Sequence, residues 1–203
     1  RALEYTKTFD LIVMEHCEDA NLMGDGVMNE GPVATRLGLQ GIPREAEYTV
    51  VGRNIALAKL TQGKLHLTHL SVKESVDLVR RAKEEGVNVT ADVTPHHLVL
   101  TEEAVAEYKA NAKVNPPLRT ESDVEALRQG LKEGVIDCIA SDHAPHTQSE
   151  KAQEFNSAPF GLIGLETMLP LMLTELVNTG IISLYDMIKR MSDQPAQIFK
   201  LPG

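Results

Sequence analysis

The stretch VIDCIASDHAPH, residues 135–146, joins a short apolar run to a cluster of one aspartate and two histidines. Its first six residues are mostly β-branched or otherwise apolar, which is typical of a strand covered on both faces. Asp142, His143 and His146 follow at the point where that strand would end. We therefore expect a buried strand whose carboxyl end carries side chains suited to metal binding or proton transfer.

Three similar apolar runs precede this one, at residues 9–15, 64–70 and 87–93. Amphipathic segments lie between the runs at residues 49–61 and 72–85, and a third begins at a capping box formed by Ser122 and Glu125. A fourth helix is expected to start at Ser183, three residues before Asp186. This alternation of strands and helices favours parallel strands joined by helical crossovers.

Two α/β architectures fit the alternation, an open doubly wound sheet and a (β/α)8 barrel. The sequence has no G-x-G-x-x-G after its first apolar run and no G-x-x-x-x-G-K-[ST], so the common phosphate-binding open sheets lack support. Histidine or aspartate closes or follows every predicted strand, at His16, His69, His96–His97 and Asp142. Because the carboxyl ends of barrel strands converge on one centre, we predict an α/β fold of the (β/α)8 TIM-barrel type.

Imidazole and carboxylate groups at neighbouring strand ends are suitable ligands for Zn²⁺ or a similar divalent ion. His66 precedes His69 on the same strand but lies deeper, so we interpret it as structural. Cys17 faces away from His16 on an extended segment and is interpreted as a packing residue. For His96 and His97, a structural role and a functional role both remain open.

Composition limits the classes of partner. The chain has 203 residues, 42% of them hydrophobic, and a formal net charge of −9, which argues against nucleic-acid or anionic-membrane binding. Two cysteines are too few for a disulfide framework, and no apolar run reaches the roughly 18 residues that span a bilayer. We expect a cytoplasmic protein that acts on a small molecule.

Six motifs carry a resemblance to one enzyme family: MEHCED (14–19), HLTHLS (66–71), DVTPHHLVLT (92–101), NPPLR (115–119), SDHAPH (141–146) and APFGLIGLET (158–167). With these motifs in this order, the chain resembles the dihydroorotases of the bacterial type I kind, in the metal-dependent amidohydrolase superfamily. The resemblance implies reversible cyclisation of N-carbamoyl-L-aspartate to L-dihydroorotate in pyrimidine biosynthesis, with two zinc ions in the complete active site.

The resemblance also implies roles for individual residues. His16 and His69 match the histidines that hold one zinc ion at the ends of barrel strands five and six. Asp142 matches the strand-eight aspartate, which binds the other zinc ion and serves as the catalytic acid and base. The positions that match substrate-binding residues are Asn115, His146, Phe160 and Gly161. Arg119 is a further candidate for the substrate carboxylate, with a loop-anchoring role equally open.

The family's strand-one His-x-His pair, the arginine after it and the bridging acidic or carboxylated group on strand four have no counterpart in these residues. We therefore interpret residues 1–203 as the C-terminal half of the barrel domain, strands five to eight with their helices. The N-terminal half and the small β-domain lie outside the sequence. On this interpretation the isolated chain would have little or no activity.

Three alternatives remain open. The chain could belong to a related cyclic amidase such as a hydantoinase or allantoinase, or to a non-catalytic dihydroorotase-like partner of aspartate transcarbamoylase, or to a metal-free structural domain. A homodimer is a further possibility that the sequence leaves open. Residues 144–163 are expected to form a long loop, and ordering of that loop over substrate is a hypothesis.

Overall fold

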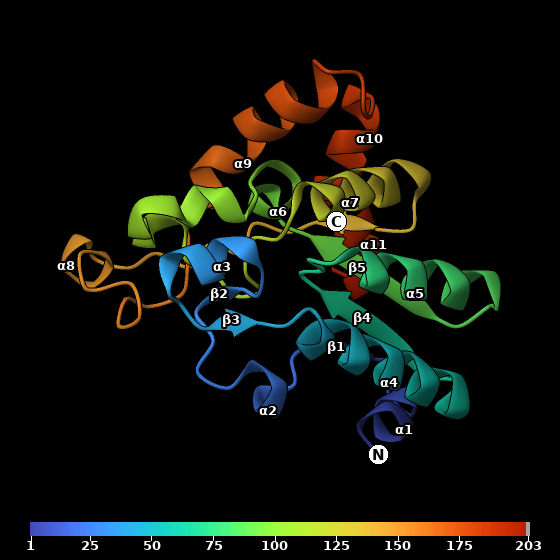
Figure 1. The fold of residues 1–203 in the computed structure, drawn as a ribbon. Helices are drawn as coiled ribbons and strands as arrows, with labels where there is room; N and C mark the ends of the chain where they lie inside the picture. Colours follow the sequence, from blue (N-terminus) through green and yellow to red (C-terminus); the bar gives the residue numbers. More distant parts are fainter. Residues whose placement is uncertain (202–203) are drawn as a thin grey trace.

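The computed structural model, drawn in Figure 1, describes residues 1–201 and has four parallel strands in one sheet. Its strands are β1 (Ile12–His16), β4 (Lys64–Thr68), β5 (Val89–Val93) and β6 (Cys138–Ile139), paired in the order β1-β4-β5-β6. Parallel neighbours require a crossover after each strand. The predicted alternation of parallel strands and helices is thereby confirmed, and within residues 1–201 the sheet stays open at β1 and β6.

Three helices provide the crossovers and pack side by side: α4 (Glu45–Thr61), α5 (Lys73–Glu84) and α7 (Glu121–Glu133) (Figure 1). Each places an apolar stripe against the sheet, as its helical periodicity predicts. The helix side chains in this core are Val50, Val51, Ala58, Val76, Val79, Ala82, Leu127 and Leu131. They meet Leu65 and Leu67 of β4, which are buried on the same face. The core therefore fixes the sheet against its helical layer.

The opposite face of the sheet is polar at its centre. Side chains alternate along a strand, so His66 and Thr68 point away from the face that carries Leu65 and Leu67. His66 pairs with Thr90 of β5 in the strand register, and Asp92 lies two residues further along on the same face. Strand β1, one of the two edge strands, adds His16 opposite Thr68. Polar groups from three strands are thus brought onto one face, towards their carboxyl ends.

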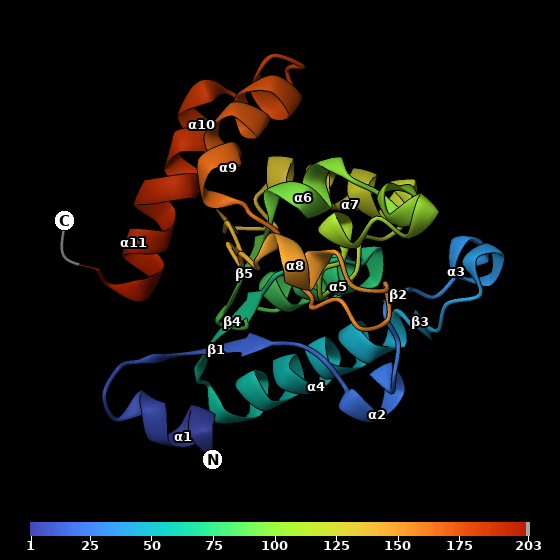
Figure 2. The ribbon, with the colours of Figure 1, turned by 90° about the vertical axis from the view of Figure 1, so that its left-hand side faces the viewer.

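A helical arm follows β6, consisting of α9 (Leu165–Met172), η3 (Leu173–Val177), α10 (Leu184–Ile188), η4 (Lys189–Asp193) and α11 (Gln194–Phe199). Figure 2 shows α10 and α11 on one side of the strands, with α3 on the far side. Met168, Met172 and Met187 are buried in the core, and Met191 packs against it. The ring of Phe199 packs edge-to-face on His66, with centroids 4.9 Å apart.

Shorter elements connect these layers: α1 (Ala2–Lys7), α2 (Ala20–Met23), β2 (Met28–Asn29), α3 (Pro32–Leu37), β3 (Gly41–Ile42), α6 (Pro95–Val99), η1 (Glu102–Tyr108), η2 (Ala110–Ala112) and α8 (Gln148–Lys151). Strands β2 and β3 pair in parallel as a separate two-stranded sheet. Arg119 is buried beside them and donates to the Ile42 carbonyl at 2.7 Å and to Asn29 Oδ1 at 2.8 Å. This geometry matches the loop-anchoring alternative for Arg119. No helix within residues 1–201 combines the length and apolar character needed to cross a membrane.

Several predicted boundaries were wrong. The first strand begins at Ile12 rather than residue 9, because α1 ends in a turn in which Asp10 has φ +53° and pairs with Lys64 and Lys200. The first crossover helix begins at Glu45 rather than residue 49, directly after Pro43 and Arg44.

The capping box before α7 is also not the predicted one. It is formed by Thr120 and Asp123 rather than by Ser122 and Glu125. Asp123 has tertiary partners in Arg44 and the Lys73 backbone, and these fix it as the third residue of the helix. The predicted cap of α10 is confirmed, since Ser183 Oγ accepts from the Asp186 backbone at 3.0 Å.

Candidate active site at the carboxyl ends of the strands

The first pair of predicted site residues meets where β4 and β6 end. His69 Nε2 lies 3.5 Å from Asp142 Oδ1. Both residues adopt the left-handed backbone region, with φ +59° at His69 and +44° at Asp142. For non-glycine residues such conformations cost on the order of 1–3 kcal/mol each and cluster at functional sites. Backbone strain at both members of the pair is consistent with a functional constraint on their side chains.

Asp92 of β5 holds the His69 side chain in place. Its carboxylate accepts from the His69 backbone N–H at 2.8 Å, from His69 Nδ1 at 2.9 Å and from Thr68 Oγ1 at 2.7 Å. It also bonds His66 Nε2 at 2.9 Å. A carboxylate only accepts, so the Nδ1 proton of His69 points to Asp92, and Nε2 faces Asp142 with a lone pair when the ring is neutral.

The electrostatics agree with this arrangement. Burial raises the pKa of Asp92, but hydrogen bonds from His66 and His69 outweigh it and hold that pKa well below its ordinary value. Burial lowers the pKa of His69, but its bond to Asp92 and the charge of Asp142 leave that pKa raised. Burial raises the pKa of Asp142, against the lowering effect of His69 and His16. Asp92 is therefore the ionised anchor of the cluster.

His16 and His96 border the same cluster. His16 is exposed, and its ring centroid lies 6.2 Å from that of His69. His96 is 6% exposed and its Nε2 has no hydrogen-bond partner within the described chain, although it lies 4.0 Å from Asp142 Oδ2. Burial lowers the pKa of His96 to about 3, so its ring is neutral near pH 7. A buried, unpartnered nitrogen of this kind is costly unless another group completes its bonding.

His97 is structural. Its Nε2 lies 2.9 Å from the Pro116 carbonyl, which can only accept, so the Nε2 proton is donated to that oxygen. Its Nδ1 lies 2.7 Å from Thr94 Oγ1, which caps α6. His97 thus links the end of β5 to the segment that carries Asn115. The structural and functional roles left open for His96 and His97 can now be divided between the two residues. His97 has the structural role, because only His96 approaches Asp142.

The donors present fit part of a metal site. Within residues 1–201, no group of three or more His, Cys, Asp or Glu side chains is arranged to hold a metal ion. His69 and Asp142 nevertheless bring an imidazole nitrogen and a carboxylate oxygen together, with the unpartnered His96 nitrogen beside them. His69 is also braced by Asp92, as metal-binding histidines usually are by a second carboxylate. Nitrogen and oxygen donors of this set are those that zinc accepts.

The predicted substrate-binding residues fall into two groups. Asn115 Nδ2 donates to Glu18 Oε2 at 2.5 Å, which places it beside the segment that follows His16. His146 Nε2 donates to the Phe160 carbonyl at 2.9 Å, so the segments after β6 and before α9 lie side by side. Gly161 has φ +139°, and a Cβ atom there would lie 2.5 Å from the Ala144 carbonyl. Only glycine fits this position without strain.

Sequence reasoning missed two residues of the site, Asp92 and Glu18. Asp92 lies inside an apolar run, and the only signal is that it alternates with Thr90 in VNVTADV.

The segment predicted as a loop at 144–163 contains the short helix α8. A cavity of about 620 Å³ next to Phe160 is lined by none of His16, His69 and Asp142, so it lies outside the metal-competent cluster.

Solved structures with the same fold define the class. L-Hydantoinase (dihydropyrimidinase) from Arthrobacter aurescens superposes with a TM-score of 0.86 at 27% identity, and dihydropyrimidinase from Brevibacillus agri NCHU1002 with 0.85 at 27%. Each match covers 98% of this chain and 45% of the other. The four strands and their helices are therefore part of the barrel of an amidohydrolase, as predicted.

Sequence relatives narrow the class to one family. Dihydroorotase from Caldanaerobacter subterraneus subsp. tengcongensis is 57% identical over 98% of this chain and 46% of its own length. Dihydroorotase from Endomicrobium trichonymphae is 52% identical over 100% and 48%. A family model described as dihydro-orotase-like matches residues 2–75. The chain belongs to the dihydroorotase family and spans about half the length of these curated relatives.

Proposed function

We propose that residues 1–203 are the C-terminal half of the catalytic barrel of a dihydroorotase. The reaction is the reversible, zinc-dependent cyclisation of N-carbamoyl-L-aspartate to L-dihydroorotate in the cytoplasm. The observation that carries the proposal is the approach of His69 Nε2 to Asp142 Oδ1, with His69 held by Asp92. Identity above 50% to curated dihydroorotases supports the choice of reaction within the superfamily.

Asp142 is the proposed catalytic acid and base. In the hydrolytic direction, water adds to the ring carbonyl carbon and its proton passes to a carboxylate oxygen of Asp142. As the carbon–nitrogen bond breaks, Asp142 returns that proton to the leaving ring nitrogen, and the ring opens to the ureido acid. The biosynthetic direction reverses these steps. Asp142 is only partly buried, with 25% of its side chain exposed, so substrate can reach it.

His16, His69 and Asp142 are the proposed metal ligands. His16 and His69 would hold one zinc ion and Asp142 the other, and the two ions of the complete site would polarise the reacting carbonyl and make water more acidic. Asp92 fixes the ring of His69 so that Nε2 stays directed at Asp142. His96 adds a neutral ring beside the carboxylate that moves the proton.

Substrate binding is assigned to Asn115, His146 and the segment Phe160–Gly161. Asn115 offers both a donor and an acceptor, which suits a ureido group or a ring amide. His146 donates to the Phe160 carbonyl, so it orders the segment whose backbone is proposed to face the pyrimidine ring. Glycine at position 161 lets this segment pack against the Ala144 carbonyl, which a Cβ atom would approach to 2.5 Å, and so keeps it beside the segment that carries His146.

The same proposal implies that a second half-barrel completes this one. The described sheet pairs β1 and β6 on one side only, and each of these strands needs a neighbour to close a barrel. The complete chain would add the first four strands and the remaining zinc ligands. We expect residues 1–203 alone to have little or no turnover.

A related cyclic amidase is the second candidate, because the hydantoinase structures share the fold at 27% identity. The test is turnover of L-dihydroorotate, hydantoin and allantoin by a chain of the relatives' full length that contains these residues. Preference for L-dihydroorotate supports the proposal, and preference for hydantoin or allantoin overturns it. Absence of all three activities in a folded chain would favour a scaffold for aspartate transcarbamoylase. Sedimentation of the same chain tests for a homodimer and for that partner.

A further inference from the structure

A buried lysine lies between the two groups of proposed substrate residues. Lys113 is 2% exposed and is among the largest fully buried side chains of the described chain. Its Nζ donates to the backbone carbonyls of Phe155 at 2.7 Å, Asn156 at 3.1 Å and Ala158 at 2.7 Å. The same nitrogen lies 4.6 Å from the ring centroid of Phe160 and 5.3 Å from that of Phe155. The Lys113 ammonium group therefore contacts residues along the whole segment 155–160.

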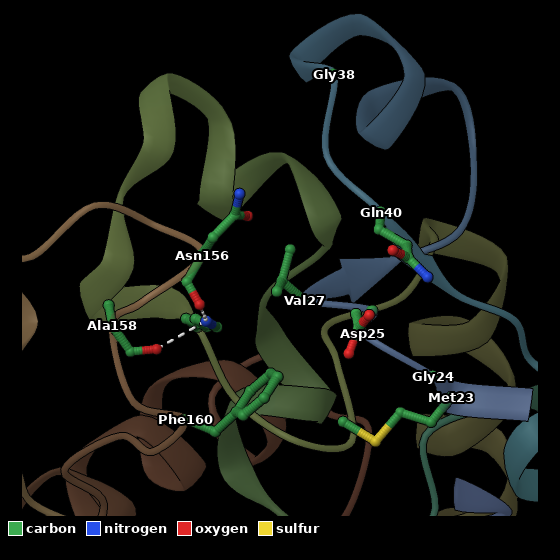
Figure 3. A pocket seen from close by; sticks show the side chains of 11 residues that line it. Met23, Gly24, Asp25, Val27, Gly38, Gln40, Asn156, Ala158 and Phe160 are labelled. Carbon is green, nitrogen blue, oxygen red and sulfur yellow. Dashed lines mark hydrogen bonds between the residues drawn. The ribbon is translucent and has the colours of Figure 1, made fainter. Parts of the chain in front are cut away.

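This lysine is not available to bind a ligand. An ammonium group has three donors, and each is used by a carbonyl oxygen. The aromatic faces add cation–π attraction to the same charge. Figure 3 shows Asn156, Ala158 and Phe160 on one side of the neighbouring cavity and Asp25, Gln40 and Met23 on the other. Burying a charged group is costly unless the group is hydrogen-bonded. The carbonyl oxygens that bind the Lys113 ammonium must therefore stay in place, and this constrains the segment that carries them.

The backbone of Lys113 is bound to the same segment. Its carbonyl accepts from the Gly161 N–H at 2.9 Å. Lys151 of α8 reinforces the join, since its Nζ donates to the carbonyls of Pro159 at 2.9 Å, Ala110 at 3.0 Å and Lys113 at 3.3 Å. Two lysines thus tie residues 155–161 to residues 110–113. The second of these segments leads within two residues to Asn115.

We propose that Lys113 is a positioning residue for substrate binding: it sets Phe160 and Gly161 at a fixed place relative to Asn115. The role rests on the proposed function, because Asn115, Phe160 and Gly161 are its proposed substrate-binding residues. Lys113 touches no reacting atom. The segment 155–161 is consequently held before substrate arrives, in contrast to a loop that orders only on binding.

The test uses a full-length chain that contains these residues, in wild-type form and with Lys113→Met. Methionine keeps most of the side-chain length but removes the charge and the three hydrogen bonds. We expect faster amide hydrogen exchange across residues 155–161, and a dissociation constant for L-dihydroorotate raised about tenfold or more, with kcat changed less than about twofold. Zinc content should stay equal to that of the wild type.

Lys109→Met is the matched control, because Lys109 is exposed and, within residues 1–201, its ammonium group pairs only with Glu107 at 3.2 Å. It should leave exchange, affinity and kcat unchanged. If Lys113→Met does not fold, Lys151→Met is the alternative variant, because Lys151 is only half-buried and its replacement should destabilise the chain less. It should shift amide hydrogen exchange and the affinity for L-dihydroorotate in the same direction.

Three results would overturn the proposal: rapid exchange at Gly161 in the wild type, wild-type affinity in a folded Lys113→Met chain, or loss of kcat and zinc together in that variant. A wild-type chain that binds zinc but not L-dihydroorotate contradicts the proposed substrate instead. In that case the hydrogen-exchange comparison still shows whether Lys113 holds the segment.

Discussion

His69 Nε2 and Asp142 Oδ1 lie 3.5 Å apart, although the two residues follow strands β4 and β6, which are separated in the sheet by β5. Asp92 of the intervening strand binds His69 from the other side. The three side chains come from three successive parallel strands, at the end where a barrel gathers its functional groups. This relationship is the geometric basis of the proposed zinc-dependent reaction.

Replacing Asp142 with asparagine should abolish turnover without unfolding the chain. Asparagine tolerates the positive φ of +44° at this position, so the backbone is preserved. The loss of the proton carrier should lower kcat for L-dihydroorotate by about 10²–10⁴-fold. Steady-state kinetics of the full-length chain measure this effect, and circular dichroism checks the fold. Turnover within a few-fold of the wild type would contradict the role of Asp142.

Asp92→Asn should weaken zinc binding. The amide cannot accept bonds from the His69 backbone, His69 Nδ1 and His66 as the carboxylate does, so the tautomer of His69 is no longer fixed. We expect an affinity loss of about 10–100-fold, measured by competition with a chromogenic chelator.

The control for that variant is Asp137→Asn. Asp137 is also a buried carboxylate next to β5, where it accepts from Lys83 at 2.7 Å and from the Ala91 backbone at 2.8 Å. This variant should lower stability but keep wild-type zinc affinity. Equal losses of affinity in both variants would mean that Asp92 acts only through the fold.

Gly161→Ala should disturb the segment before α9. A methyl group there would lie 2.5 Å from the Ala144 carbonyl, and φ +139° is strained for any residue with a Cβ atom. We expect weaker binding of L-dihydroorotate with unchanged zinc content, measured by calorimetry and elemental analysis. Gly180→Ala, at a turn where no atom lies within 4 Å of the added Cβ, controls for the backbone strain alone. Wild-type affinity in the Gly161 variant would contradict the assignment of Phe160–Gly161 to the substrate site.

Leu131→Ala should destabilise the layer of crossover helices. Leu131 is 0% exposed in α7, and truncation of a buried leucine costs about 2–5 kcal/mol. Leu60→Ala in α4 is the matched control, since Leu60 is 78% exposed and should shift stability by less than about 0.5 kcal/mol. Urea denaturation of the full-length variants measures both. Similar midpoints for the two would contradict the described packing of α7.

Much of the fold could be predicted because each apolar run is followed by a distinct helical pattern. His69 and Asp142 could be identified because they stand at the ends of those runs. The errors at the start of β1 and at the capping box of α7 have a common cause, namely tertiary partners outside the local pattern. Thr120 and Asp123 outcompete Ser122 and Glu125 as the capping box because Arg44 and the Lys73 backbone bind Asp123.

Two features could not be predicted from local sequence. Asp92 is an acidic residue inside a strand, and its role becomes visible only when the register places it beside Thr68 and His69. Lys113 reads as an ordinary loop lysine, and its burial depends on carbonyl oxygens some 40 residues later in the chain. Both side chains act through contacts distant in sequence, for which periodicity and spacing carry no signal.

The most direct test of the account is zinc stoichiometry by elemental analysis, paired with turnover of L-dihydroorotate, in the full-length chain and in residues 1–203 alone. The account predicts two zinc ions and turnover in the full-length chain, with both lost or greatly reduced in the half-barrel. A full-length chain that folds without zinc, or one whose turnover of L-dihydroorotate survives complete removal of metal, would contradict it.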